Sequence, residues 1–525
     1  MIDCEFSAVG GLPRGRVKWG NDQMSFRYYD WIRHHAQTRE DKIAVIDIAS
    51  DRRFDYREWD DRIGRLASYL RRIGVAKGDR IATLTSNCVE MLEVQFACFR
   101  VGAIFLPLNI RLTFSELEFI ASDAGVSYLV FTPEFEPLAR QLEAALKLKG
   151  TLGVGDAYEK ALSNESPLAD LCQMDITDVS TIMYTSGTTG RPKGATITHL
   201  MTFINCVNLG LPARVNPEST HINVLPLFHT GGLNCYTNPV LHAGGTVIVM
   251  QAFDASQFLQ FMADPSLNIT HMFGVPSIYQ FLALAPEFET ADLSRLQIAG
   301  VGGAPLPIEV LKTWQKRGVT LVQGYGMTET SPGVVCLDPR DAARKIGSAG
   351  KPLLHAEVKI VDPSGNAVKR GDIGEIWVRG PNITPGYWNR PDANAASFTD
   401  GWLHTGDLAR EDEEGFIYIV DRSKDMYISG GENVYPAEIE DVLSQHPAVR
   451  ECAVIGIADE RWGEVGLAII GLKDASQQPE ADILAYCRSH LAKFKCPARL
   501  VFVDVIPRNA TGKLDKPTLR AQYGG

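Results

Sequence analysis

Segments of helical periodicity alternate with short apolar runs along most of this chain, and this alternation constrains the fold more than any other feature. Residues 56–73 place apolar side chains at helical spacing, and an apolar strand-like run follows at 80–85. The pattern predicts a buried helix over 89–99 and another short strand over 102–107. The same alternation of helical and strand-like segments recurs at 235–330. Strands without a polar face belong to sheets that are covered on both sides, so the sequence predicts an α/β fold.

The chain has 525 residues, too many for one ordinary core. Near residue 355, alternating strands and tight turns replace the α/β pattern. The charged segment Asp421–Asp425 then precedes a hundred residues of mixed strand and helix. We therefore expect a large N-terminal domain of layered α/β sheets over 1–421, with a β-rich subdomain at about 355–420. A small α+β domain is expected over 422–525.

Bulk composition narrows the class of protein. The formal charge of −11 and the pI of about 5.6 argue against a general nucleic-acid binder. Ten cysteines occur without a Cys-x-x-Cys pair, which is typical of reduced thiols in a cytoplasmic protein. No signal pattern and no long apolar run predicts an integral membrane segment. A homodimer is compatible with these features, but no feature specifies one.

The stretch Tyr184–Gly194 predicts a phosphate site. It places three glycines, four hydroxyls and two cations between two expected strands. Glycines let backbone N–H groups approach an anion, and the hydroxyls and cations add further donors. The stretch is not the common P-loop, because Lys193 follows a proline and no Ser or Thr comes after it. A polyphosphate held between two strands is the interpretation that fits.

Four further motifs occur in a fixed order with this loop: Gly302-Gly-Ala-Pro305, Gln323-Gly-Tyr-Gly-Met-Thr-Glu329, Trp402-Leu-His-Thr-Gly-Asp407 and Pro507-Arg-Asn-Ala-Thr-Gly-Lys513. Together they resemble the adenylate-forming superfamily, which holds acyl-CoA synthetases, the adenylation domains of peptide synthetases and beetle luciferases. The resemblance covers roughly residues 25–520 and is closest to fatty-acyl-CoA and 4-coumarate-type CoA ligases. The segment 428–440 is especially similar to theirs.

The resemblance implies a two-step reaction with ATP, Mg²⁺ and coenzyme A. A carboxylate attacks the α-phosphate of ATP, giving acyl-AMP and pyrophosphate, and the CoA thiol then displaces AMP. The implied substrate is a fatty acid or an aryl acid such as a hydroxycinnamic acid, which would place the enzyme in fatty-acid or phenylpropanoid metabolism. Small residues at Gly302, Gly303, Gly324 and Gly326 favour a roomy acyl pocket.

The resemblance also assigns roles to individual residues. The catalytic set would be Lys513, Thr185, Glu329 and His229, with Thr185 and Glu329 holding Mg²⁺. Phe228, His229, Gly324 and Gly326 would border the acyl group, and Phe228 with His229 would form an aromatic gate. ATP and AMP would be bound by Thr185, Ser186, Gly187, Thr188, Thr189, Gly190, Lys193, Gly302, Gly303, Ala304, Gln323, Gly324, Tyr325, Gly326, Met327, Thr328, Asp407, Arg422 and Lys513.

In the family the small domain rotates between the two half-reactions. Lys424 matches the hinge position, and the rotation would carry Lys513 away from the site. The loop containing Gly430 and Gly431 would then line the CoA tunnel, with Trp462 and Phe494 against the CoA nucleotide.

Three other functions stay open from the sequence. The chain could be a free-standing adenylation enzyme that charges a carrier-protein thiol, and CoA-dependent AMP release would distinguish it from a CoA ligase. A luciferase-type oxygenase would reveal itself by light or CO₂. A catalytically inactive nucleotide sensor is disfavoured, because competent residues occupy the transferred ATP positions.

Overall fold

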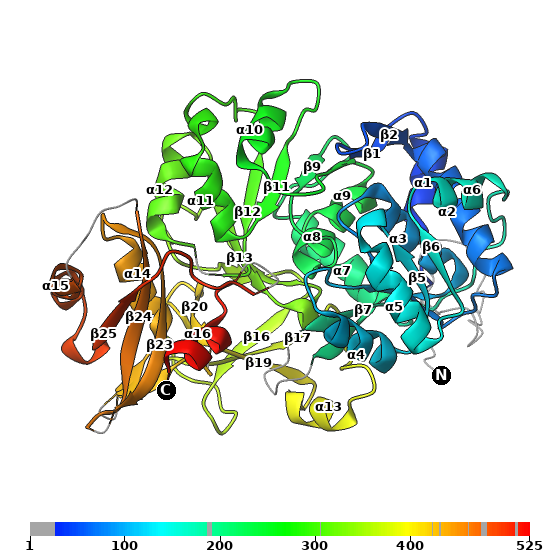
Figure 1. The fold of residues 1–525 in the computed structure, drawn as a ribbon. Coiled ribbons are helices and arrows are strands. Elements are labelled where there is room, and N and C mark those ends of the chain that lie inside the picture. The colour runs from blue at the N-terminus through cyan, green and yellow to red at the C-terminus, as the bar shows by residue number, and fades with distance from the viewer. Residues whose placement is uncertain are drawn as a thin grey trace, which may run out of the picture.

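The computed structural model describes residues 27–185, 192–304, 306–422, 424–429, 432–459, 461–473, 480–509 and 513–524, without the side chains of Arg422 and Asn433. Its strands form four sheets, of nine, six, five and five strands. Figure 1 shows the N-terminal blue and cyan elements at one end of the molecule and the orange and red C-terminal elements at the other. The predicted α/β class, with a β-rich part and a C-terminal α+β unit, is confirmed.

The nine-stranded sheet has the order β15-β14-β13-β12-β11-β9-β10-β1-β2. Its centre, from β1 to β13, is parallel, and the hairpin partners β2, β14 and β15 add antiparallel edges. The strands are β1 (Ile43–Asp47), β2 (Arg52–Asp55), β9 (Thr220–Asn223), β10 (Thr246–Val249), β11 (His271–Gly274), β12 (Ile298–Val301), β13 (Leu321–Gly326), β14 (Gly333–Cys336) and β15 (Lys351–Pro352).

The six-stranded sheet has the order β6-β5-β3-β4-β7-β8, and only the hairpin β7–β8 is antiparallel among its described pairings. Its strands are β3 (Arg80–Leu84), β4 (Ile104–Pro107), β5 (Val126–Phe131), β6 (Gly150–Gly153), β7 (Val179–Thr185) and β8 (Lys193–Thr198). The expected strands at 80–85 and 102–107 are therefore confirmed as β3 and β4, both in the interior of this sheet.

Helices cover these two sheets. Helix α2 begins where Asp55 and Glu58 form a reciprocal cap, and it occupies the residues that the periodicity predicted. The helices of this region are α1 (Trp31–Thr38), α2 (Tyr56–Arg72), α3 (Val89–Val101), α4 (Phe114–Ala124), η1 (Pro133–Phe135), α5 (Glu136–Leu146), α6 (Asp156–Ser163), α7 (His199–Gly210), α8 (Thr230–Asn234), α9 (Thr237–Ala243), α10 (Ala255–Ala263), α11 (Pro276–Leu284), η2 (Pro286–Glu289), α12 (Ile308–Lys316) and η3 (Thr328–Thr330). No helix among the described residues has both the length and the apolar character needed to cross a membrane.

The β-rich region forms an antiparallel sheet from β16 (Glu357–Val361), β17 (Gly374–Arg379), β18 (Phe398–Thr399), β19 (Trp402–Glu411) and β20 (Ile417–Arg422), with α13 (Pro391–Ser397) beside it. The C-terminal sheet contains β21 (Tyr427–Ser429), β22 (Glu432–Val434), β23 (Val449–Asp459), β24 (Gly463–Leu472) and β25 (Arg499–Phe502). Its helices are α14 (Pro436–Ser444), α15 (Glu480–His490), η4 (Lys493–Lys495) and α16 (Lys516–Tyr523).

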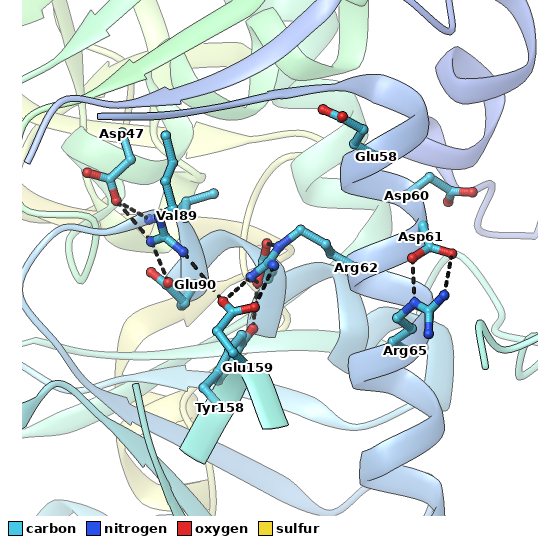
Figure 2. A network of polar contacts seen from close by, with 12 residues as sticks. Asp47, Glu58, Asp60, Asp61, Arg62, Arg65, Val89, Glu90, Tyr158 and Glu159 are labelled. Atoms are coloured by element: carbon cyan, nitrogen blue, oxygen red, sulfur yellow. Dashed lines mark hydrogen bonds and ion pairs between the residues drawn. The ribbon is translucent and has the colours of Figure 1, made fainter. Parts of the chain in front are cut away.

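A network of charges, buried at Glu93 and exposed at Glu159, joins the helices at the N-terminal end. Arg62 of α2 donates to Glu159 of α6 at 2.7 Å (Figure 2). It also donates to Glu93 of α3, at 2.6 Å. The Tyr158 hydroxyl also donates to Glu93, at 2.7 Å. Burial raises the pKa of Glu93 although Arg62 opposes that rise. Since an unpaired buried charge is costly, this network fixes how α2, α3 and α6 pack together.

Buried histidines make the stability of this region sensitive to acid. His199, at the start of α7, lies between the rings of Tyr28 and Phe99, with centroid distances of 4.3 and 4.8 Å. Burial lowers the pKa of His199 to about 3, a shift that Asp178 opposes and Lys77 reinforces. The unfolded chain therefore binds more protons than the folded chain between about pH 3 and 6.5, so stability is complete above that window and falls as the pH drops.

We expect His199→Phe to weaken this acid sensitivity, because Phe keeps the aromatic packing and cannot titrate. Between pH 7.5 and 5, the wild-type protein should lose about 2 kcal/mol more unfolding free energy than the variant. Urea unfolding followed by tryptophan fluorescence at several pH values measures this difference. Parallel pH profiles for the two proteins would show that His199 is not responsible.

Candidate active site

Most of the predicted site residues lie where strands of the two large sheets end. Thr185 is the last residue of β7, and Gly302 follows β12 directly. β13 runs from Leu321 to Gly326, so the motif that begins at Gln323 starts inside a strand. Gln323 pairs with Val301 of β12, and Gly324 to Gly326 pair with β14, so these residues are part of the strand. Ligands of open α/β sheets bind at such carboxyl ends of strands.

The predicted phosphate loop closes a β hairpin. Thr185 and Lys193 stand opposite each other in the β7–β8 ladder, and the Thr185 hydroxyl donates to the Lys193 carbonyl at 3.4 Å. Both residues are half-buried. The intervening predicted residues Ser186, Gly187, Thr188, Thr189 and Gly190 lie outside the described residues.

A strap formed by residues 384–388 runs along β8. The Thr196 N–H donates to the Gly386 carbonyl at 3.1 Å, and the Trp388 N–H donates to the Gly194 carbonyl at 2.7 Å. These bonds hold the backbone of the strap against β8, which places the Tyr387 side chain beside Glu329 and Lys193. Its hydroxyl donates to Glu329 Oε1 at 2.9 Å, while Lys193 Nζ lies 5.4 Å from the centre of its ring. Burial, reinforced by Glu329, raises the pKa of Tyr387, so its hydroxyl remains a donor.

Glu329 lies in the short helix η3 and is 5% exposed. Its carbonyl accepts from the Thr384 N–H at 2.7 Å, so the strap holds both its backbone and its side chain. Thr328 precedes it in the same turn, after Met327. At Gly326 an added Cβ would lie 1.7 Å from the Pro332 carbonyl oxygen, so close backbone packing requires glycine there irrespective of any acyl pocket.

Tyr325 and Asp407 come together from different sheets. The Tyr325 hydroxyl donates to Asp407 Oδ2 at 2.7 Å, and Asp407 faces Arg422 in the β19–β20 ladder. The resemblance assigned both residues to the binding of ATP and AMP. Their hydrogen bond orients the ring and the carboxylate toward each other, a link that neither motif contained.

The Lys513 side chain reaches the glycine turn after β12. Gly303 has a left-handed φ of +81°, and a Cβ added there would lie 3.4 Å from Lys513 Cε. Gly302 is buried against the ring of Phe273, and Ala304 is exposed beside it. The backbone of Lys513 is held by Asn509, whose side-chain oxygen accepts from the Lys513 N–H at 3.1 Å. The C-terminal unit therefore presents its predicted catalytic lysine to the nucleotide side of the large sheets.

The two residues of the predicted aromatic gate, Phe228 and His229, immediately precede α8. His229 precedes the helix, and its ring lies 4.6 Å from that of Phe228, edge to face. The turn before them is held by buried Asn87, which donates to the Leu225 carbonyl at 2.9 Å and accepts from the Leu227 N–H at 2.8 Å. Gly232 packs on this turn, since an added Cβ would lie 2.3 Å from the Pro226 carbonyl oxygen.

The predicted CoA-side residues are only partly described. Gly430 and Gly431 lie outside the described residues, between β21 and β22. The aromatic side chains of Trp462 and Phe494 are 49% and 39% exposed, as stacking on a nucleotide would require. Lys424 is exposed after β20, and the side chain of Arg422 is outside the described part.

Sequence reasoning missed Tyr387, Thr384 and Asn87. They touch the site through pairing between segments far apart in the chain, and each lies outside the motifs that carry recognisable chemistry. The turn Pro385-Gly-Tyr387 was the one local signal, and it indicates only a change of chain direction.

This arrangement, a nucleotide-type site at the strand ends of two α/β sheets with a lysine supplied by a small C-terminal unit, defines an adenylate-forming enzyme. The model of the AMP-binding enzyme family matches residues 32–388, and the model of the AMP-binding enzyme C-terminal domain matches residues 438–513. The chain therefore belongs to the AMP-binding enzyme family.

Named relatives agree with this assignment. The chain is 44% identical over 469 residues to a feruloyl-CoA synthase of Amycolatopsis, covering 89% of this chain and 94% of that protein. It is 36% identical to a long-chain-fatty-acid–CoA ligase of Mycobacterium tuberculosis, covering 91% and 95%. The solved structure of an anthranilate CoA ligase with anthranoyl-AMP superposes with a TM-score of 0.89 at 28% identity, covering 94% and 97%. The chain is an ATP-dependent acid–CoA ligase that acts through an acyl-AMP.

We expect Tyr387→Phe to slow acyl-AMP formation about tenfold or more, because Glu329 loses a buried donor to its carboxylate. The retained ring keeps its contact with Lys193. Pyrophosphate exchange into ATP measures the effect.

Tyr158→Phe is the matched control, since the Tyr158 hydroxyl also donates to a carboxylate, that of Glu93, at 2.7 Å. It should leave the exchange rate unchanged. Equal losses in both variants would mean that Tyr387 acts through general stability and not through Glu329.

Proposed function

We propose that this ligase activates an aromatic acid of the hydroxycinnamate type. The observation that carries the proposal is the 44% identity, over nearly nine-tenths of the chain, with a protein named for feruloyl-CoA synthesis. The rings of Tyr236 and Phe273 add support. They lie 5.6 Å apart and pack on β12, where a Cβ added to Gly300 would lie 2.5 Å from the Tyr236 hydroxyl oxygen. A flat acyl group beside Gly302 would meet aromatic side chains there.

In the first half-reaction a carboxylate oxygen forms a bond to the α-phosphorus while the bond to the pyrophosphate oxygen breaks. Anionic groups meet in this step, so cations and N–H donors lower the barrier where charge develops. In the proposed assignment Lys513 contacts the carboxylate and the α-phosphate, Thr328 donates to the α-phosphate, and Lys193 with the loop before it holds the departing pyrophosphate. In the second half-reaction the CoA sulfur bonds to the acyl carbon and AMP leaves.

Magnesium would be held by Thr185 and Glu329, with the ATP phosphates completing its ligands. Both residues offer hard oxygen donors, and Glu329 is a buried carboxylate already oriented by Tyr387. Within the described ranges no cluster of three or more His, Cys, Asp or Glu side chains could hold a metal by itself. One hydroxyl, one carboxylate and the ATP phosphates suit Mg²⁺, because this ion binds through few protein oxygens plus substrate phosphates and neutralises the phosphate charge.

The domain division at 421/422, the hinge at Lys424 and the CoA contacts of Gly430, Gly431, Trp462 and Phe494 belong to the same proposal. Two neighbouring ion pairs support a hinge at this point. Arg520 binds Asp425 at 2.8 Å, and buried Lys516 binds Glu440 at 2.9 Å.

The nine described cysteines are all free thiols, which supports the prediction of a cytoplasmic location. A homodimer stays a prediction.

Lys513→Ala should reduce acyl-AMP formation about 10²- to 10³-fold, the scale for losing one preorganised donor to developing charge. Thioester formation from supplied acyl-AMP should largely survive, because that step does not use the lysine. Pyrophosphate exchange and CoA-thioester formation measure the two steps separately. Lys316→Ala, which removes an exposed lysine of α12, is the control. Equal loss in both half-reactions of Lys513→Ala would contradict the assigned role.

A panel of acids tests the substrate. We expect kcat/KM for ferulate and coumarate to exceed the value for palmitate by about tenfold or more, because a pocket shaped for a flat ring binds a flexible alkyl chain less well. Pyrophosphate release measured with each acid gives the comparison. A higher kcat/KM for palmitate would favour the fatty-acid alternative, which the 36% identity with a fatty-acid–CoA ligase keeps as the second candidate.

A further inference from the structure

Buried carboxamide side chains form a continuous chain beneath the gate helix α8. Gln95 of α3 donates to Asn238 of α9 at 3.0 Å, and Asn238 donates to Asn234 Oδ1 at 2.7 Å. Asn205 of α7 then donates to the Asn234 carbonyl at 2.7 Å. Each of the four side chains is at most 2% exposed. Breaking one of these buried hydrogen bonds would leave a polar group without a partner, which makes the chain rigid.

The chain continues from Asn205 to the opposite side of the site. The Gly333 N–H, at the start of β14, donates to Asn205 Oδ1 at 3.0 Å. Asn382, which is fully buried, donates to the Gly333 carbonyl at 2.8 Å and to the Thr330 carbonyl at 3.0 Å. Thr330 ends the helix η3 that contains Thr328 and Glu329.

Asn205 is therefore the member shared by two parts of the site. Its NH₂ group satisfies the carbonyl at the C-terminal end of α8, which has no partner within the helix. Its oxygen satisfies an N–H just after the segment that contains Glu329. Helix α8 has five residues and begins directly after His229, so holding its last residue also sets the position of the gate.

We propose that Asn205 is a positioning residue that sets the separation between the acyl side of the site, at Phe228 and His229, and the ATP side, at Thr328 and Glu329. This inference rests on the proposed roles of those four residues. Carboxylate attack requires the acid and the α-phosphate in one geometry, and a displacement of about 1 Å can cost a hundredfold in rate. Asn205 acts on that geometry through two hydrogen bonds and touches neither substrate.

Asn205→Leu tests the inference, because leucine has a similar volume and makes neither hydrogen bond. We expect kcat for acyl-AMP formation to fall about 10- to 100-fold, with ATP binding in the absence of acid unchanged. Thioester formation from supplied acyl-AMP should stay within about threefold of wild type, since the acyl–phosphate bond already exists. Pyrophosphate exchange, equilibrium ATP binding and single-turnover thioester formation give the three readouts.

Asn208→Leu is the matched control from the same helix. Asn208 is 1% exposed and accepts from the His355 N–H at 3.1 Å, so it ties α7 to the β-rich region and not to α8. It should lower the thermal midpoint about as much as Asn205→Leu and leave acyl-AMP formation unchanged.

Asn238→Leu is a second test variant that removes the hydrogen bonds of the chain on the gate side only. It should slow adenylation by a smaller factor, about threefold or more.

The outcomes separate the inference from the site assignment when His229→Ala and Glu329→Gln are measured beside them. If these two variants slow adenylation while Asn205→Leu and Asn238→Leu do not, the positioning role is overturned and the proposed site stands. If none of the four variants slows adenylation, the site assignment itself fails. An equal slowing by Asn208→Leu would reduce Asn205 to a role in stability.

Discussion

The pairing of the 384–388 strap with β8 is the contact on which the site depends. Two backbone hydrogen bonds from the strap to β8 fix its path, and a third ties Thr384 to the Glu329 carbonyl. Tyr387 thereby stands between Lys193 of β8 and the Glu329 carboxylate of η3. The strap thereby joins the β7–β8 hairpin to the segment after β13, and in the proposed site it fixes the spacing between Lys193 and Glu329.

The C-terminal unit depends on a second set of contacts near residue 421. Asp421 accepts from the Ala437 N–H at 3.0 Å, at the first turn of α14, where a negative charge is favoured. Lys516 is buried nearby. Burial alone would lower its pKa, but Glu440, Asp421 and Asp425 together raise it, so the lysine is charged and paired. Lys516 follows Lys513 by three residues, and the side chain of Lys513 reaches Gly303. A rotation at Lys424 would have to exchange the Asp421 contact for others.

The strongest predictions from sequence concerned local patterns. The helix at 56–73 was predictable because its periodicity reports which side faces the core. The strands at 80–85 and 102–107 were predictable because short apolar runs are typical of sheets covered on both faces. The site motifs were recognisable because their residue types are those that phosphate and ribose chemistry needs. The hydrogen bond between Tyr325 and Asp407 was not predictable, since it joins residues 82 positions apart on separate sheets. Gly326 was interpreted as space for a substrate, whereas crowding by the Pro332 carbonyl accounts for it locally.

The sequence by itself determined the fold class, the family and the set of chemically competent residues, because these follow from patterning and from motifs a few residues long. The tertiary structure decided which of those residues meet and what holds them. Tyr387, Asn87 and Asn205 carry no sequence signal, because an amide or a phenol has a structural meaning only once burial requires each of its polar atoms to find a partner. In this protein those partners are carbonyls and N–H groups of the site segments and the Glu329 carboxylate, so hydrogen bonds that satisfy buried groups also hold the proposed site together.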